Sequence, residues 1–160
     1  MSSNNLVISE SSKDVYDSSA ADMKQFVTME IDGQLFGIPV VTVQDILRDQ
    51  SITNIPMSKR EIRGAINLRG RIVTVVDMRT RLGLKELELT KDSKHVVIDY
   101  KGEQYSFLVD EVGEVLSLSL SDFENNPANL APNWQELSLG VYRLESRLLL
   151  ILNIESLLKF

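Results

Sequence analysis

Cysteine is absent from this chain of 160 residues, and histidine occurs once, at His95. Without thiols the protein can form no disulfide, no zinc–thiolate site and no cysteine nucleophile. The longest uninterrupted apolar run, Leu148 to Leu152, is far shorter than the roughly 20 residues that a membrane helix needs. The first residues also lack the basic and then apolar layout of a secretion signal. These absences predict a soluble, cytoplasmic protein.

Sequence signatures of common catalytic and ligand sites are missing as well. No phosphate-loop glycine pattern occurs, and no Gly-x-Ser-x-Gly, paired-carboxylate or metal-ligand spacing is present. His95 begins an apolar run, at the position where an earlier, similar segment has Phe26. A small hydrolase built on His95 is the competing hypothesis, but a structural histidine fits this setting better. We therefore predict no catalytic residue, no metal and no cofactor.

The charge balance is acidic, with a formal net charge of -6. Nucleic-acid binding needs a basic face that releases counterions, so this balance argues against DNA or RNA as the main partner. The segment 59–81 is a local exception, with seven basic residues against two acidic ones. It holds no aromatic side chain on which bases could stack. A solvated basic face and a docking site for an acidic protein both remain open, and a nucleic-acid-binding small barrel is the weakest alternative.

The chain contains two copies of one sequence repeat. Residues 64–79 align without a gap with residues 140–155, and residues 27–47 align with residues 96–116. Apolar positions coincide through both alignments, as do several glycines. The sequence therefore predicts an internal duplication.

The two copies differ in the turn between their paired apolar runs. The first copy has Arg69-Gly70 at this turn, whereas the second has Glu145-Ser146. Packing keeps apolar positions alike and leaves turn chemistry free to differ, so this turn is where we look for function. Gly64 and Gly70 are interpreted as structural turn residues.

Short apolar runs with alternating polarity, separated by glycine turns, predict an all-β chain with short helices. Strands are expected over 27–31, 35–38, 52–55, 62–68, 72–76, 95–100, 103–109, 138–144 and 147–152. Apolar residues at helical spacing predict a short helix from Val40 to Leu47, with Pro39 in its first turn. Asp77 and Asn153 are each expected to cap a short helix.

About five strands per copy predict two small five-stranded β-barrels, which would remove exposed sheet edges. Residues 1–24 contain seven serines and few apolar side chains, which predicts a disordered tail. The first barrel repeat is expected over about 25–84 and the second over about 94–160. One copy could lend a strand to the other, a feature that the sequence does not reveal.

Several sequence blocks, in order, resemble the CheW family of bacterial chemotaxis coupling proteins over residues 25–159. The blocks are 35–40, 43–46, 62–70, 75–79, 108–112 and 151–155. Thr74 departs from this resemblance because the family usually has Pro there. Asp45 departs too, since the family commonly has Glu, and the shorter side chain leaves open whether it reaches Arg69.

The resemblance implies a fold of two SH3-like barrels and a role without catalysis. It implies an adaptor between the cytoplasmic tips of methyl-accepting chemoreceptors and the histidine kinase CheA, located at receptor arrays on the inner face of the membrane. The receptor-binding groove that it implies comprises Val43, Asp45, Ile46, Arg69, Val96 and Val112. A paralogue serving a receptor array outside chemotaxis is the alternative within the same family.

An apolar surface on the second copy is expected to bind the regulatory domain of the kinase. The apolar pattern around Val97, Ile98, Tyr105 and Phe107 predicts this surface.

Overall fold

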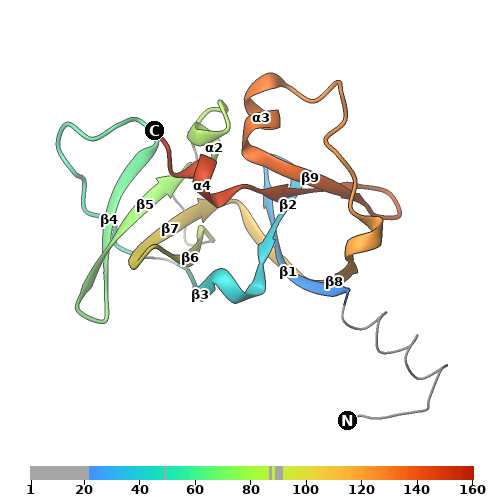
Figure 1. Ribbon diagram of the computed structural model, residues 1–160. Coiled ribbons are helices and arrows are strands. Elements are labelled where there is room, and N and C mark those ends of the chain that lie inside the picture. Colours follow the sequence, from blue (N-terminus) through green and yellow to red (C-terminus); the bar gives the residue numbers. More distant parts are fainter. Residues whose placement is uncertain (1–21, 49, 87, 89–91) are drawn as a thin grey trace, which may run out of the picture.

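The computed structural model describes residues 22–48, 50–86, 88 and 92–160 (Figure 1). Most of the predicted disordered tail, residues 1–21, lies outside the described residues. The first strand already begins at Met23, so the last residues assigned to the tail belong to a sheet.

In the described part of the chain, ten strands form two five-stranded sheets, which confirms the predicted all-β class. The first sheet has the order β8-β1-β2-β10-β9 and the second has the order β3-β6-β7-β5-β4. The strands are β1 (Met23–Ile31), β2 (Gln34–Pro39), β3 (Val43–Arg48), β4 (Ile62–Leu68), β5 (Arg71–Asp77), β6 (Lys94–Tyr100), β7 (Glu103–Val109), β8 (Glu111–Ser119), β9 (Ser138–Arg143) and β10 (Leu148–Leu152).

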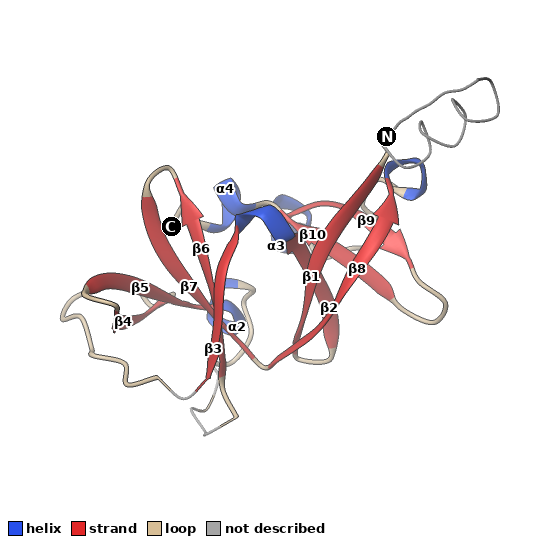
Figure 2. Ribbon diagram, turned by 90° about the horizontal axis from the view of Figure 1, so that it is seen from below, coloured by secondary structure: helices blue, strands red, loops and turns tan. Residues whose placement is uncertain are grey.

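Each sheet is closed into a barrel by an isolated backbone bridge. Thr53, which follows β3, bridges to Ala65 of β4, and Glu124, which follows β8, bridges to Val141 of β9. We call the first sheet with its bridge barrel I and the second barrel II. The expected strand at 52–55 is thus reduced to the single bridge at Thr53. Figure 2 shows the two barrels side by side, with most of the short helical segments between them.

Neither repeat builds a barrel alone, and the strand exchange that the sequence left open for the repeats 25–84 and 94–160 is present in the fold. Barrel I combines β1 and β2 of the first repeat with β8, β9 and β10 of the second. Barrel II combines β3, β4 and β5 of the first repeat with β6 and β7 of the second. Each barrel therefore combines three strands of one repeat with a two-stranded hairpin of the other. The chain crosses from barrel I to barrel II before β3 and returns to barrel I before β8.

The core has three parts because the central strands are covered on both faces. Phe26, Leu149 and Ile151 pack inside barrel I, while Val75 and Leu108 pack inside barrel II. A third and larger cluster lies between the barrels. It includes Met29, Phe36, Val76, Val96, Ile98, Phe107 and Leu150. Strands buried on both faces have continuous apolar runs, and this burial explains the run 148–152.

The predicted helix over 40–47 is wrong. Only Val40–Thr42 forms a helical turn, η1, and Val43–Arg48 is the strand β3, paired antiparallel with β6. A bulge between Val43 and Asp45 shifts the alternation by one residue, so the apolar spacing imitates a helical one. The equivalent segment in the second repeat is also a strand, β8.

Two capped helices are confirmed. Asp77 accepts hydrogen bonds from the first turn of α2 (Met78–Arg81), and Asn153 does the same for α4 (Ile154–Leu157). Helix α3 (Pro132–Leu137) and the turn η2 (Leu120–Asp122) lie between β8 and β9, where no helix was predicted. In Figure 1, α2 and α4 lie close together between the barrels.

Candidate protein-docking site

A surface ion pair joins Arg69 to Asp45. The Nη2 atom of Arg69 donates to Oδ2 of Asp45 over 2.9 Å, so the shorter carboxylate does reach the guanidinium. Arg69 is 74% exposed and Asp45 24% exposed. The pair links edge strand β3 to the β4–β5 hairpin. Because most of the guanidinium faces solvent, a partner carboxylate can reach it as well.

Arg69 occupies a backbone position that arginine does not favour. It has a φ of 53° and Gly70 a φ of 82°, the two left-handed residues of a tight hairpin turn. The side chain of Asn67 accepts a hydrogen bond from the amide of Gly70 at 3.1 Å. A non-glycine residue at such a position costs about 1 kcal/mol. The fold therefore gains nothing from arginine in preference to asparagine or glycine at this turn.

Gly64 is not a turn residue, which corrects that interpretation, whereas Gly70 does lie in the hairpin turn. Gly64 lies within β4 at a bulge, with a φ of 147°. A Cβ atom there would lie 2.3 Å from the carbonyl oxygen of Thr53. Glycine is needed because the segment that closes barrel II approaches the strand backbone. Its duplicate, Gly140, meets Phe123 and Glu124 in the same way.

Two further candidate receptor residues, Val43 and Ile46, lie on the face of β3 opposite to Asp45. Val43 pairs with Ile98 and Ile46 pairs with Val96, so both face the cluster between the barrels, whereas Asp45 pairs with Val97 of the barrel II interior. Ile46 is 45% exposed and Val43 is half-buried.

Val112, in β8 of barrel I, is half-buried against the same inter-barrel cluster as Val43. Val96 is fully buried, which corrects its assignment as a contact residue. It is the cross-strand partner of Ile46. The candidate docking surface therefore has an apolar part at Val43, Ile46 and Val112, and a charged part around the edge of β3.

The predicted kinase surface is largely wrong. Val97, Ile98 and Phe107 are completely buried. Their apolar pattern reflects burial on two faces, and truncating Phe107 would cost about 3–5 kcal/mol of stability rather than remove a contact. Tyr105 alone reaches the surface, where its hydroxyl donates to Glu103 at 2.8 Å.

Sequence reasoning missed Ile72, an exposed apolar residue beside this tyrosine. Ile72 is 70% exposed on β5. Thr74, two residues along the same strand and so on the same face, pairs with Tyr105. These three residues form a strip on the outer face of barrel II, which we call the Ile72 strip. All three positions are apolar in the sequence, and only the structure shows that Ile72 is exposed whereas Val73 and Val75 are buried.

The basic segment 59–81 is mostly engaged within the protein. Arg63 donates to the buried Asp77 at 2.8 Å, and Arg79 and Arg81 also have intramolecular partners. Ion pairs are not found for its remaining cations, Lys59, Arg60 and Arg71, within the described part of the chain. Cations already bound to carboxylates and carbonyls do not form a basic face for nucleic acid.

His95 is buried, and its Nδ1 lies 2.8 Å from Oγ of Ser106. Burial lowers the pKa of this imidazole. Among the described residues no group of three or more histidines and carboxylates is arranged to hold a metal ion. Within the same residues, no helix has the length and apolar character to cross a membrane.

Two barrels that exchange hairpins and carry a charged and apolar surface patch fit a protein-docking module. Known proteins agree with this class. The model of the CheW-like domain matches residues 25–160. The chain belongs to the CheW family, whose members are scaffold proteins of bacterial chemotaxis and not enzymes.

Relatives share modest identity over most of their length. The chain is 29% identical to the chemotaxis protein CheW of Bacillus subtilis, over 84% of this chain and 86% of the relative. It is 26% identical to the chemotaxis protein CheW of Helicobacter pylori, over 86% of this chain and 83% of the relative. Protein PilI of Pseudomonas aeruginosa is 26% identical, over 71% of this chain and 64% of the relative.

A solved structure shows the same fold. The crystal structure of the scaffolding protein TtCheW from Thermoanaerobacter tengcongensis matches with a TM-score of 0.78 at 27% identity. The match covers 86% of this chain and 93% of that one. The predicted double SH3-like barrel is thereby confirmed.

Proposed function

We propose that this protein is the adaptor that couples the cytoplasmic tips of chemoreceptors to the histidine kinase CheA, at arrays on the inner face of the membrane. Membership of the CheW family supports this role. The observation that carries it here is the exposed Arg69–Asp45 pair, held at an unfavourable backbone position next to an apolar patch.

The receptor tip is proposed to dock against Val43, Ile46 and Val112, with its acidic groups directed at Arg69. An exposed ion pair is worth only about 0–1 kcal/mol. Once a partner covers it, however, removal of one member costs about 2–5 kcal/mol, because the other charge is left desolvated and unpaired. The same guanidinium can therefore matter little for folding and much for docking.

The kinase regulatory domain is proposed to bind the Ile72 strip. An isolated large apolar side chain that is 70% exposed suits the central anchor of a small interface. A micromolar affinity, about -8 kcal/mol, is enough when an array supplies many contacts at once.

Titration calorimetry tests both halves of the proposal. The protein should bind the isolated regulatory domain of the cognate kinase, and Ile72→Ser should weaken this binding at least tenfold. Val41→Ser is a matched control, because Val41 is also largely exposed but lies outside the Ile72 strip. Absence of heat with both the kinase domain and receptor tips would refute the adaptor role.

A receptor array outside chemotaxis is the second candidate, because the likeness to PilI shows that relatives bear names other than CheW. Copurification from the native cell separates the two candidates. Chemoreceptors and their kinase in the purified complex would support the chemotaxis role, whereas receptors and a kinase of another pathway would support the paralogue.

A further inference from the structure

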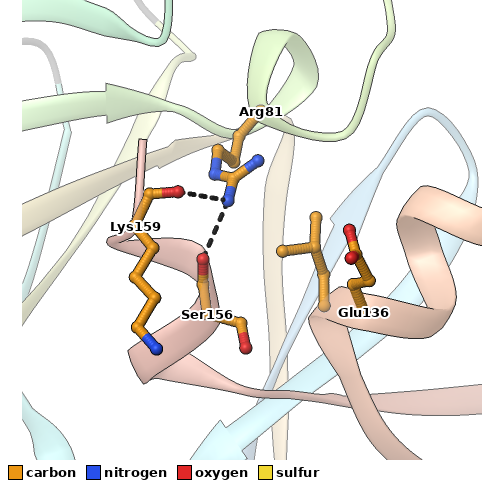
Figure 3. A pocket seen from close by; sticks show the side chains of 5 residues that line it. Arg81, Glu136, Ser156 and Lys159 are labelled. Atoms are coloured by element: carbon orange, nitrogen blue, oxygen red, sulfur yellow. Dashed lines mark hydrogen bonds between the residues drawn. The ribbon is translucent and has the colours of Figure 1, made fainter.

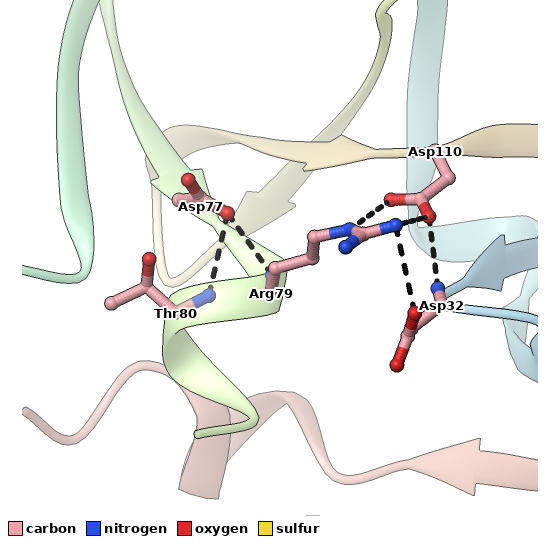
Figure 4. Close-up of polar contacts among 5 residues, drawn as sticks. All are labelled: Asp32, Asp77, Arg79, Thr80 and Asp110. Atoms are coloured by element: carbon pink, nitrogen blue, oxygen red, sulfur yellow. Dashed lines mark hydrogen bonds and ion pairs between the residues drawn. The ribbon is translucent and has the colours of Figure 1, made fainter. Parts of the chain in front are cut away.

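Helix α2 is fixed rigidly to barrel II by its N-terminal cap. The carboxylate of Asp77, at the end of β5, is completely buried. Its Oδ1 accepts from the amides of Arg79 and Thr80 (Figure 4). Its Oδ2 accepts from Arg63 at 2.8 Å. A buried carboxylate with three donors holds the helix in one orientation.

One side of α2 is bound to barrel I through Arg79. Its Nε donates to Oδ1 of Asp110 at 3.0 Å, and its Nη2 donates to Oδ2, a bidentate contact. Asp110 is the single residue between β7 of barrel II and β8 of barrel I. Asp110 also accepts from the amide of Asp32 at 2.9 Å, in the β1–β2 turn of barrel I.

The electrostatics of this contact favour the charged pair. Burial by itself raises the pKa of Asp110, but hydrogen bonds from Arg79 and from the Asp32 amide, with the charge of Arg79, hold that pKa below its usual value. The carboxylate of Asp32 lies 3.8 Å from Arg79 and adds to the attraction, as Figure 4 shows. The contact is only partly exposed to solvent, which limits screening.

The other side of α2 is bound to barrel I through Arg81. Its Nη2 donates to the carbonyls of Ser156 and Lys159 at 2.8 and 3.1 Å (Figure 3). Its Nε donates to the carbonyl of Leu157 at 2.8 Å. These carbonyls belong to the end of α4 and to the residues just after it, and α4 follows strand β10 of barrel I. The ring of Phe160 lies 5.8 Å from the same guanidinium.

The two arginine contacts occur in the first repeat and have no counterpart at the equivalent positions of the second. Helices α2 and α4 are equivalent in the two repeats, yet Arg79 and Arg81 correspond to Glu155 and Leu157. Both helices keep their capping residue, so a barrel requires the cap but not the two arginines.

We propose that Arg79 and Arg81 are positioning residues that form a bracket across the inter-barrel junction and set the orientation of one barrel relative to the other. The consequence for docking rests on the proposed function. Val112 lies two residues beyond Asp110, while Val43 belongs to barrel II, so the bracket sets the spacing of two halves of the receptor surface.

The absence of cysteine allows a direct distance measurement by paired spin labels. One pair, at Asp99→Cys and Glu145→Cys, reports across the barrels, and a second pair, at Asp99→Cys and Arg71→Cys, reports within barrel II. All three residues are exposed. The chain with the bracket intact should give one narrow distribution for each pair.

The double variant Arg79→Gln/Arg81→Gln should broaden the cross-barrel distribution at least twofold and leave the distribution within barrel II unchanged. Arg143→Gln is the matched control, because it breaks an ion pair with Glu124 inside barrel I and should change neither distribution. If the double variant does not fold, the single variants and Arg79→Lys, which keeps the charge but loses the bidentate fork, decide the question. An unchanged cross-barrel width in folded variants would overturn the bracket.

Receptor binding separates this inference from the proposed function. The broadened variants should bind receptor tips at least tenfold more weakly, while binding of the kinase domain to the Ile72 strip stays within twofold. Failure of the intact chain to bind receptor tips would refute the proposed function. The spin-label distances would still test whether Arg79 and Arg81 set the orientation of the barrels. Normal receptor binding by variants with a broadened distribution would refute the positioning role.

Discussion

Arg69 and Asp45 form an ion pair of 2.9 Å although 24 residues separate them, and the pair joins the edge strand of barrel II to a hairpin turn of the same barrel. Both residues belong to the first repeat, and the duplicate of Arg69 is Glu145. The pair is therefore a local addition to a repeated framework, located beside the apolar patch proposed to receive the receptor.

Replacing Arg69 with asparagine should leave the thermal midpoint unchanged or slightly raised. The exposed pair contributes about 0–1 kcal/mol, while asparagine tolerates the left-handed backbone better than arginine. Thermal unfolding followed by circular dichroism measures this. A midpoint lowered by an amount equivalent to about 2 kcal/mol would show that Arg69 has a structural role in the turn.

Gly64→Ala should destabilise the protein far more than Gly70→Ala. At Gly70 the only penalty is the positive φ, about 1 kcal/mol, because no atom lies within 4 Å of the added methyl group. At Gly64 the methyl group also collides with the Thr53 backbone that closes barrel II. Denaturant unfolding of the two variants should differ by at least about 2 kcal/mol. Equal losses would contradict the closing bridge.

His95 should make the protein less stable as the pH falls below about 6.5, the ordinary pKa of an unfolded histidine. Burial lowers its pKa in the folded state, so the unfolded chain binds the proton more readily in this window. The stabilising contribution is complete above pH 6.5 and is lost as the pH falls through the folded pKa. Melting midpoints across this range measure the effect.

The control for His95 copies the other repeat, where Phe26 occupies the equivalent position. His95→Phe, combined with Ser106→Ala so that no buried hydroxyl loses its partner, should flatten the pH dependence between about pH 5 and 6.5. An equally steep dependence in this variant would assign the effect to other groups.

Sequence patterns predicted the hairpins, helix caps and duplication well because these features are local. The capping residues Asp77 and Asn153 and the glycine turns act on neighbouring backbone and need no tertiary context. The hairpin exchange could not be predicted in the same way, because either partner of a repeated strand satisfies the same apolar pattern.

The candidate site was predicted only in part. Val43, Asp45, Ile46 and Arg69 lie at the surface in the proposed region, but Val96 and the apolar strands around Val97 do not. An apolar run does not reveal whether a partner or the protein's own second barrel covers its second face. Strand β3 was mistaken for a helix because one bulge changed a two-residue period into an apparent helical one.

Reconstituted kinase activity in the presence of receptors tests the central claim most directly. Arg69→Glu is compared with Arg71→Glu, a charge reversal in the same hairpin at a residue without an ion pair in the described part of the chain. We predict that Arg69→Glu folds normally, binds the kinase domain and reduces receptor-dependent coupling at least tenfold, equivalent to about 1.4 kcal/mol, while Arg71→Glu couples nearly normally. Normal coupling by folded Arg69→Glu, or equal loss in both variants, would contradict the proposed docking site.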